Sequence, residues 1–213
     1  MRRELTASVA AVIVFTALFG LAYPLITTGA AQLIFGNEAD GSRIERDGVT
    51  VGSELIGQEF TKKVRRGSPD ASRTFKPVAD ERYFQPRPSV TGYSANVTYF
   101  NNLGPNNREL SEFFEKQING YLELEGPYTP GLERSDVPVD AVTTSASGVD
   151  PHISEANAEI QANRIAEERG LGLDRVLELI SDNTDGRALG FLGEPGVNVL
   201  ELNLALDEEE GSA

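Results

Sequence analysis

Residues 5–37 read LTASVAAVIVFTALFGLAYPLITTGAAQLIFGN and contain no charged side chain. Within them, Ala7 to Ile26 supplies about 20 mostly apolar residues, the number that spans a hydrocarbon core roughly 30 Å thick. The stretch therefore predicts a single N-terminal transmembrane helix in residues 1–35. Everything behind it should form a separate soluble part of the chain.

Small and helix-bending residues interrupt this apolar stretch. Thr16 and Gly20 would let another helix approach closely, and Pro24 is tolerated in membrane helices. Tyr23 suits either an interfacial anchor or contact with a neighbour. We therefore expect Thr16, Gly20, Tyr23 and Pro24 to pack against a partner helix.

A cleaved signal peptide is the alternative interpretation of the N-terminus. Arg2 and Arg3 would form its positive region, and the small residues 29–31 would lie near the cleavage site. Signal-peptide cores are about 7 to 15 residues long, whereas this one is longer and continues through residues 33–35. An uncleaved anchor is favoured. The positive-inside tendency then places the N-terminus in the cytoplasm and the C-terminal domain outside the cell membrane.

The composition excludes several function classes. The 213 residues include 33 acidic and 19 basic side chains, for a formal net charge of −14. Removing Arg2, Arg3 and Glu4 leaves −15, so the acid excess lies behind the anchor. Such a charge works against affinity for nucleic acid. The chain has no Cys and one His, which excludes thiolate and multi-His metal sites, and we expect no bound metal.

The pattern behind the anchor predicts a mixed α/β soluble domain over residues 36–206. Asp47-Gly48 indicates a hairpin that leads into residues 49–56, and the charged stretch 61–80 is typical of a solvated loop. Apolar spacing predicts helices at residues 108–124, 155–169 and 173–180, and alternation predicts a strand at 197–206. We expect Asn106 or Asn107 to cap the first helix, Ser154 and Gly170 the second.

The last seven residues, 207–213, read DEEEGSA. Like charges repel and nothing in this segment can build a core, so the sequence predicts a disordered tail.

Few residues carry recognisable catalytic chemistry. The chain has no GxxxxGK[ST] and no GxGxxG motif behind a strand, so independent nucleotide binding is not expected. Residues 145–150 offer Ser, Gly and Asp but lack the GxSxG elbow and a separate base. His152 fits a turn before a helix. We assign no catalytic residue, and an enzyme is the least favoured class.

Gln161 and Arg164 could present an amide and a guanidinium on the same side of a helix, because residues three apart are neighbours there. They could bind a ligand together. A solvated face or a hydrogen bond inside the fold is the alternative, and spacing alone favours the alternative.

Ordered sequence blocks along nearly the whole chain resemble the KdpC family, the small subunits of Kdp-type potassium-transporting P-type ATPases. The likeness includes Gln161-x-x-Arg164. The other blocks are Thr16-x-x-x-Gly20-x-x-Tyr23-Pro24, Gly52-Ser53-x-Leu55-Ile56-Gly57-Gln58-x-Phe60, Tyr83-Phe84-x-x-Arg87-Pro88-Ser89, Asn102-Leu103-Gly104-Pro105-x-Asn107, Val137-Pro138-Val139-Asp140-x-Val142-Thr143, Ser147-Gly148-x-Asp150-Pro151-His152-Ile153-Ser154, Gly193-x-Pro195-x-Val197-Asn198 and Leu202-Asn203-x-Ala205-Leu206.

The resemblance implies a non-hydrolysing accessory subunit of an ATP-driven potassium import complex. Its partners would be a KdpA-like channel subunit, a KdpB-like ATP-hydrolysing subunit, a KdpF-like small membrane peptide and the lipid bilayer. Family members are described as catalytic chaperones that raise ATP affinity, with the glutamine that matches Gln161 helping to coordinate nucleotide. ATP would thus be shared with the hydrolysing subunit, with Gln161 and Arg164 as nucleotide-associated residues.

Two points stay open at this stage. Nucleotide contact requires a cytoplasmic domain, which conflicts with the orientation that Arg2 and Arg3 predict. The alternative function is a free-standing, membrane-anchored module that binds a small ligand outside the cell.

Overall fold

The structure is a computed structural model that describes residues 2–65, 75–97, 99 and 102–211. Contacts divide the chain into two units, Met1–Ser53 and Glu54–Ala213. Each unit is described by itself. The division falls after a short hairpin, so the first unit extends beyond the membrane anchor expected in residues 1–35.

The anchor is helical from Arg2 to Ile34, and it is the one helix among the described residues that is long and apolar enough to cross a membrane. It comprises α1 (Arg2–Ala17), a π-helical segment (Leu18–Ala22) and α2 (Tyr23–Ile34). The π segment has a local cause. Pro24 has no N–H and its ring would clash with the carbonyl four residues back, and a wider turn relieves this clash. The N–H of Tyr23 accordingly donates to the Leu18 carbonyl, five residues back.

A short helix, α3 (Gly36–Ala39), leads into the predicted hairpin. Strands β1 (Arg43–Arg46) and β2 (Val49–Ser53) pair antiparallel. Asp47 and Gly48 have φ values of +53° and +75°, the left-handed pair that a tight type I′ turn requires.

The solvated loop predicted at residues 61–80 is wrong at both of its ends. Strands β3 (Thr61–Arg65) and β4 (Phe75–Ala79) pair antiparallel in a second hairpin, with Thr61 opposite Ala79. Charged residues can occupy an exposed two-stranded ribbon because its faces need not be buried. These strands therefore lack the alternation of apolar and polar residues from which a strand is predicted. The middle of the predicted loop lies outside the described residues.

Helix α4 (Arg108–Glu125) confirms the first predicted helix, and the Asn107 side chain caps it by accepting from the N–H of Glu109 at 2.7 Å. A 3₁₀ turn (Arg134–Asp136) and the short helix α5 (Val139–Val142) follow.

Helix α6 (Glu155–Arg169) has the two predicted caps: the Ser154 hydroxyl accepts from the N–H of Asn157, and Gly170 ends the helix at φ +67°. Helix α7 (Leu173–Asp182) confirms the third predicted helix. A three-stranded antiparallel sheet in the order β5-β7-β6 completes this region, formed by β5 (His152–Ile153), β6 (Thr184–Asp185) and β7 (Gly196–Asn198).

The predicted strand at residues 197–206 is wrong beyond Asn198, because α8 (Val199–Gly211) is a helix. The Asn198 side chain caps it, accepting from the N–H groups of Leu200 and Glu201 at 3.1 and 3.3 Å. Leucines at every second position suggested a strand, but Leu, Glu and Ala favour a helix. The buried positions Val199, Leu202, Asn203 and Leu206 follow the helical spacing of three and four.

The same helix overturns the disordered tail predicted for residues 207–213, as far as Gly211. Asp207 accepts from the Arg169 guanidinium at 3.0 Å, and Glu209 pairs with Arg175 at 2.5 Å. Opposite charges on α6 and α7 thus offset the repulsion that the tail sequence suggested. The final two residues lie outside the described part of the chain.

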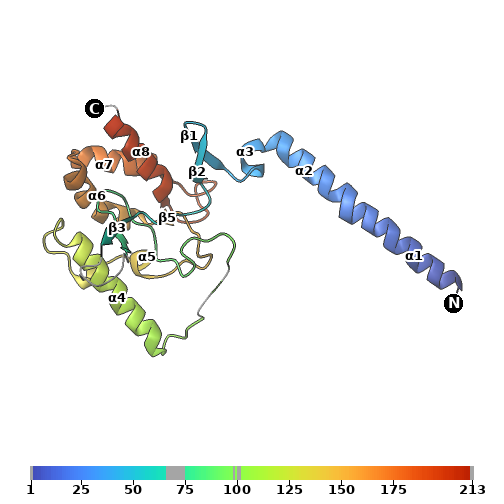
Figure 1. Cartoon of the computed structure of the whole chain (residues 1–213), viewed down its shortest axis with the longest axis horizontal. Coiled ribbons are helices and arrows are strands. Elements are labelled where there is room, and N and C mark those ends of the chain that lie inside the picture. The colour runs from blue at the N-terminus through green and yellow to red at the C-terminus, as the bar shows by residue number, and fades with distance from the viewer. Residues whose placement is uncertain (1, 66–74, 98, 100–101, 212–213) are drawn as a thin grey trace. The chain divides into compact units, whose positions relative to one another are not determined.

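The core of the second unit lies between its helices and the three-stranded sheet. Helix α6 contacts both α4 and α7, and α7 contacts α8 (Figure 1). The buried apolar side chains of this core are Phe84 and residues from β5, β7, α6, α7 and α8: Ile153, Ala158, Ala162, Ile165, Val176, Leu179, Ile180, Val197, Val199, Leu202 and Leu206. The chain is therefore a mixed helix and strand fold behind one apolar N-terminal helix, as the sequence predicts.

Candidate functional site

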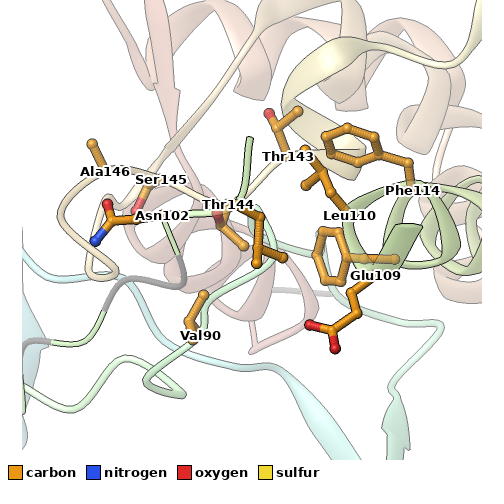
Figure 2. Close-up of a pocket in the computed structure, with 11 residues that line it drawn as sticks. Val90, Asn102, Glu109, Leu110, Phe114, Thr143, Thr144, Ser145 and Ala146 are labelled. Atoms are coloured by element: carbon orange, nitrogen blue, oxygen red, sulfur yellow. The ribbon is translucent and has the colours of Figure 1, made fainter. Parts of the chain in front are cut away.

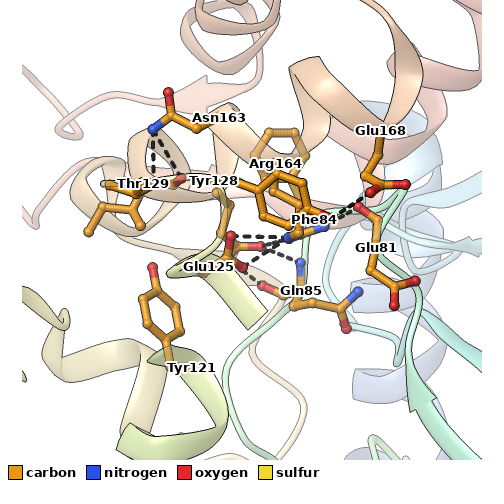
Figure 3. A network of polar contacts seen from close by, with 12 residues as sticks. Glu81, Phe84, Gln85, Tyr121, Glu125, Tyr128, Thr129, Asn163, Arg164 and Glu168 are labelled. Carbon is orange, nitrogen blue, oxygen red and sulfur yellow. Dashed lines mark hydrogen bonds and ion pairs between the residues drawn. The ribbon is translucent and has the colours of Figure 1, made fainter. Parts of the chain in front are cut away.

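Gln161 and Arg164 both lie inside the second unit, on the side of α6 that faces α4 and the segment 81–85. The Arg164 side chain has no exposed surface, and Gln161 is 1% exposed. Figure 3 shows Arg164 extending toward Glu125 at the end of α4. The two residues are thus in the same network, and that network is enclosed by protein.

The Arg164 guanidinium uses all three of its nitrogens. Nε donates to both carboxylate oxygens of Glu125 at 3.1 Å. Nη1 donates to the carbonyls of Glu81 and of Tyr83, the latter at 3.0 Å, and Nη2 donates to Gln161 Oε1 at 2.9 Å. The planar fork of an arginine matches such a divided set of acceptors, which a lysine could not reach at once.

The Gln161 amide has no free hydrogen-bonding position in this arrangement. Its oxygen accepts from the Gln85 N–H at 2.7 Å and from Arg164. Its nitrogen donates to the Gln85 carbonyl at 3.1 Å and to Asn157 Oδ1 at 3.0 Å. An amide has two donors and two acceptor positions, and all four are used.

Side chains from α6 and α8 bind the backbone at every residue of the segment 81–85. The Asn203 side chain accepts from the Phe84 N–H at 2.9 Å and donates to the Phe84 carbonyl at 3.0 Å. Gln161 binds the backbone of Gln85 in the same two-sided way. Arg169 donates to the Arg82 carbonyl at 2.6 Å and lies over the Tyr83 ring at 4.6 Å. These side chains supply the hydrogen-bond partners that a neighbouring strand would supply to the backbone of this segment if it were part of a sheet.

Glu125 is the buried carboxylate on which this network depends, and its side chain has no exposed surface. Burial raises the pKa of Glu125, and the charge and hydrogen bonds of Arg164 oppose that rise. Sequence reasoning missed Glu125 because its partner is 39 residues away. The available signal was its position four residues after Tyr121, on the same side of the helix. The Tyr121 hydroxyl donates to Asn157 Oδ1 at 3.0 Å, so this side faces α6.

Asp140 extends the polar network to the start of α6. Its carboxylate accepts from the Ser154 N–H at 2.9 Å, from the Ser154 hydroxyl at 2.7 Å and from Asn157 Nδ2 at 2.8 Å. A carboxylate at a helix N-terminus is favourable because the N–H groups there have no partner within the helix. Asp140 therefore joins α5 to α6.

The two motif blocks that contain Arg87 and Asp150 meet in space although 63 residues separate them. Arg87 Nη1 lies 3.0 Å from Asp150 Oδ2. The backbone carbonyl of Arg87 also accepts from the Tyr93 hydroxyl at 2.5 Å. Pro151, buried behind Asp150, accepts from the Val199 N–H at the start of α8 at 3.0 Å.

Ser89 and Gly148 form the second contact between these blocks, on the chain beyond Pro88. The Ser89 hydroxyl donates to the Gly148 carbonyl at 2.6 Å and accepts from the N–H groups of Thr91 and Tyr93 at 3.2 and 3.1 Å. Gly148 has φ +73°, and a Cβ there would lie 3.0 Å from Thr91 Oγ1. A side chain at this position would thus both strain the backbone and crowd the contact.

The serines of residues 145–150 organise the same turn. Ser145 Oγ accepts from the Gly148 N–H at 2.8 Å, and Ser147 Oγ accepts from the Val149 N–H at 3.2 Å. Hydroxyls used in this way stabilise a tight turn and are not aligned with a base.

His152 lies between two carboxylates. Its Nε2 is 2.9 Å from Asp185 Oδ2 and its Nδ1 is 3.4 Å from Asp150 Oδ1. The hydrogen bond with Asp150 raises the pKa of His152; burial opposes this and Asp185 adds to it. Burial by itself would raise the pKa of Asp150, but the hydrogen bonds with His152 and the charge of Arg87 leave it lowered. The cluster of Arg87, Asp150, His152 and Asp185 therefore joins β5, β6 and the segment around residue 87 by charge.

The anchor residues lie on a helix whose described side chains the chain itself does not bury. A Cβ built on Gly20 would meet Thr16 Cγ2 at 3.7 Å, an ordinary contact, and Tyr23 is 60% exposed. Thr16, Gly20, Tyr23 and Pro24 thus lie at or beside the π segment and are open to lipid or to another helix.

A cavity of about 760 Å³ in the second unit lies beside the first half of α4. Figure 2 shows Leu110 and Phe114 of α4 facing Thr143 and Thr144, with the Glu109 carboxylate at the rim. The other lining residues are Val90, Asn102, Leu103, Phe113, Ser145 and Ala146. The apolar spacing predicted the helix at residues 108–124, and sequence reasoning did not anticipate a pocket there.

In the described part of the chain, no group of three or more His, Asp and Glu side chains is arranged to hold a metal ion. The polar residues that the sequence singled out form hydrogen bonds and ion pairs with one another's segments, and these contacts stabilise the fold of the second unit.

Comparison with known proteins identifies the chain's relatives. The family described as KdpC, K⁺-transporting ATPase, c chain, matches residues 5–208. The Potassium-transporting ATPase KdpC subunit of Mycobacterium tuberculosis is 44% identical over 209 residues, covering 97% of this chain and 99% of the relative. Proteins of the same name from Rhodospirillum rubrum (45%, covering 98% and 97%) and Koribacter versatilis (41%, covering 97% and 95%) are similar over almost the same extent.

Arg164→Lys should destabilise the fold. Lysine keeps the positive charge but leaves several buried acceptors without a donor, each costing about 1–3 kcal/mol. We expect the free energy of unfolding to fall by roughly 2–4 kcal/mol, measured by urea unfolding of the detergent-solubilised chain with circular dichroism. Arg108→Lys is the matched control: its side chain is 91% exposed and forms an ion pair with Glu112, so a change within about 0.5 kcal/mol is expected. Equal effects of the two variants would contradict the structural role of Arg164.

His152 should make stability depend on pH. Its folded-state pKa lies above the ordinary value near 6.5, so protonated His152 stabilises the fold fully below about pH 6.5, and this contribution is lost as the pH rises through the folded-state pKa. The lowered pKa of Asp150 acts oppositely: its contribution is present above about pH 4 and is lost on acidification.

The measurement compares urea unfolding of the wild-type chain and of His152→Asn at about pH 6 and pH 8.5. The wild-type chain should lose stability relative to the variant as the pH rises. A constant difference between the two proteins across this interval would show that the imidazole charge does not contribute.

Proposed function

The chain belongs to the KdpC family, the C chain of the potassium-transporting ATPase, and from this we propose that it is a non-hydrolysing accessory subunit that assembles and stabilises an ATP-driven potassium import complex. The observation that carries the proposal is the extent of the match, residues 5–208, which includes most of the apolar N-terminal helix and most of the second unit. A role in the potassium transport complex follows from the family, and the accessory role is the proposal.

The internal geometry supports a scaffolding role. The motif residues Arg87, Ser89, Gly148, Asp150 and Gln161 form hydrogen bonds or ion pairs with one another's segments. Such contacts fix the shape of a surface that other subunits can recognise. They leave no nucleophile or base with a free, activated position among these motif residues.

We propose that the N-terminus is cytoplasmic and that the second unit lies outside. Arg2 and Arg3 precede the span, while the acid excess follows it, and this arrangement agrees with the positive-inside tendency. The partners in this proposal are a channel-like subunit, an ATP-hydrolysing subunit and a small membrane peptide, together with the bilayer.

The effect on ATP affinity that is expected of a catalytic chaperone would then act through the membrane-spanning subunits. Direct contact of ATP with Gln161 and Arg164 stays a prediction, and it would require the buried network to open. The cavity beside Gln161 has a volume of about 210 Å³, below the 300–1,000 Å³ typical of small-molecule sites.

The 760 Å³ pocket on α4 favours one second candidate, a free-standing anchored module that binds an apolar ligand outside the cell. Co-purification separates the two functions. Tagged chain from native membranes should bring down an ATP-hydrolysing and a channel-like subunit if it is an accessory subunit, and neither of them if it works alone.

The orientation can be tested with one cysteine, because the natural chain has none. Asp174→Cys places a thiol at an exposed position at the start of α7. In sealed right-side-out vesicles, a membrane-impermeant maleimide should label this variant, and in sealed inverted vesicles it should label only after the vesicles are opened. The reverse pattern would place the second unit in the cytoplasm, where nucleotide contact becomes feasible.

Gly20→Leu should weaken assembly without damaging the chain, since only the flexible Thr16 side chain approaches that position. A leucine would keep a neighbouring helix from close contact, and we expect the recovery of partner subunits to fall several-fold. Gly29→Leu is the matched control, because a Cβ there meets nothing within 4 Å. Pro24→Ala should also lower recovery by removing the cause of the π segment. Unchanged recovery with Gly20→Leu and Pro24→Ala would mean that the helix serves only as a tether.

A further inference from the structure

The loop between β6 and β7 carries an exposed apolar tip, residues 188–192, with the sequence ALGFL. Leu189 is 83% exposed, Phe191 68% and Leu192 50%. Single exposed apolar residues are common, but three large ones within four positions are a feature of interaction sites.

The backbone holds this tip in a defined shape. Ala188 and Leu192 exchange two hydrogen bonds, Ala188 N–H to the Leu192 carbonyl at 2.8 Å and Leu192 N–H to the Ala188 carbonyl at 2.9 Å. Leu189 has φ +55°, a conformation in which a glycine would be unstrained. The strained position thus presents a leucine side chain at the apex, and strain that a fold maintains is a reason to look for function.

The charged groups at the base of the tip are paired with one another. Arg187 forms an ion pair with Glu194 and donates to the Gly193 carbonyl at 2.8 Å. Asp185, the residue before the loop, lies 2.9 Å from His152 Nε2. The apolar side chains of the tip are therefore the main feature that a partner can recognise, and a surface that receives this loop needs an apolar pocket.

From these observations we infer that the 188–192 tip docks into an apolar pocket on another subunit of the transporter. The inference rests on the proposed function, which supplies the partner. A loop held in a fixed shape by its own backbone hydrogen bonds matches a pocket, whereas insertion into lipid needs no fixed shape. The bilayer is therefore the less favoured occupant.

The test substitutes both apical side chains, Leu189→Gly together with Phe191→Ser, in the tagged full-length chain. Recovery of partner subunits from native membranes should fall at least tenfold, because an apolar anchor in the middle of an interface carries much of its binding energy. The melting temperature of the purified variant should be unchanged or higher, since glycine relieves the strain at residue 189. Val139→Ser is the matched control, 74% exposed and outside the tip, and it should leave recovery unchanged.

Two failures are distinguishable. If wild-type chain recovers no partner subunits, the proposed function fails. If wild-type chain recovers them and the double variant recovers them equally well, the accessory role stands and the docking inference is overturned.

A photo-crosslinker identifies the occupant. Benzoylphenylalanine in place of Phe191 should form an adduct with a partner subunit of the purified complex. Adducts only with lipid, or only with a second copy of this chain, would overturn the inference in favour of those occupants.

Discussion

The fold of the second unit depends on satisfying the backbone of one segment, residues 81–85, which places Phe84 in the core but forms no strand itself. Buried N–H and carbonyl groups require partners, and here the partners are side chains. Arg164 and Gln161 from α6 and Asn203 from α8 bind consecutive parts of the segment. The guanidinium in turn requires Glu125, which brings α4 into the same network. The charge of Arg164 thereby joins three parts of the chain, and Asn203 adds α8 as a fourth.

The network explains why the sequence predicts this fold better than it predicts the site. Local signals hold where the decisive contacts are local: Ser154 caps α6, Gly170 ends it, and Asp47-Gly48 turns the first hairpin. The paired positions of Arg164 and Glu125 are set by tertiary structure 39 residues apart, which no spacing rule encodes. For Gln161, chemistry alone allowed a ligand or an internal role, and the structure assigns all four of its hydrogen bonds to the interior.

The errors at the end of the chain have a common physical source. Residues 199–206 offered both a period of two and a helical period, and packing against α7 selects the helix. The mutual repulsion of the acidic residues that follow predicts a disordered tail. Arg169 and Arg175, which precede them by more than 30 residues, instead supply opposite charges along the α8 surface. Charge patterning predicts order poorly when the compensating charges come from elsewhere in the fold.

The π segment of the anchor has a geometric consequence for how the membrane helix meets its surroundings. A wider turn inserts an extra residue, and one residue corresponds to about 100° around a helix axis. The row of side chains along one side of α1 is therefore not continued in line by α2, which begins at Tyr23 and is rotated around the helix axis. The two halves of this helix therefore present their side chains in different directions around the axis. A single helix can in this way contact two neighbours at different heights along its length.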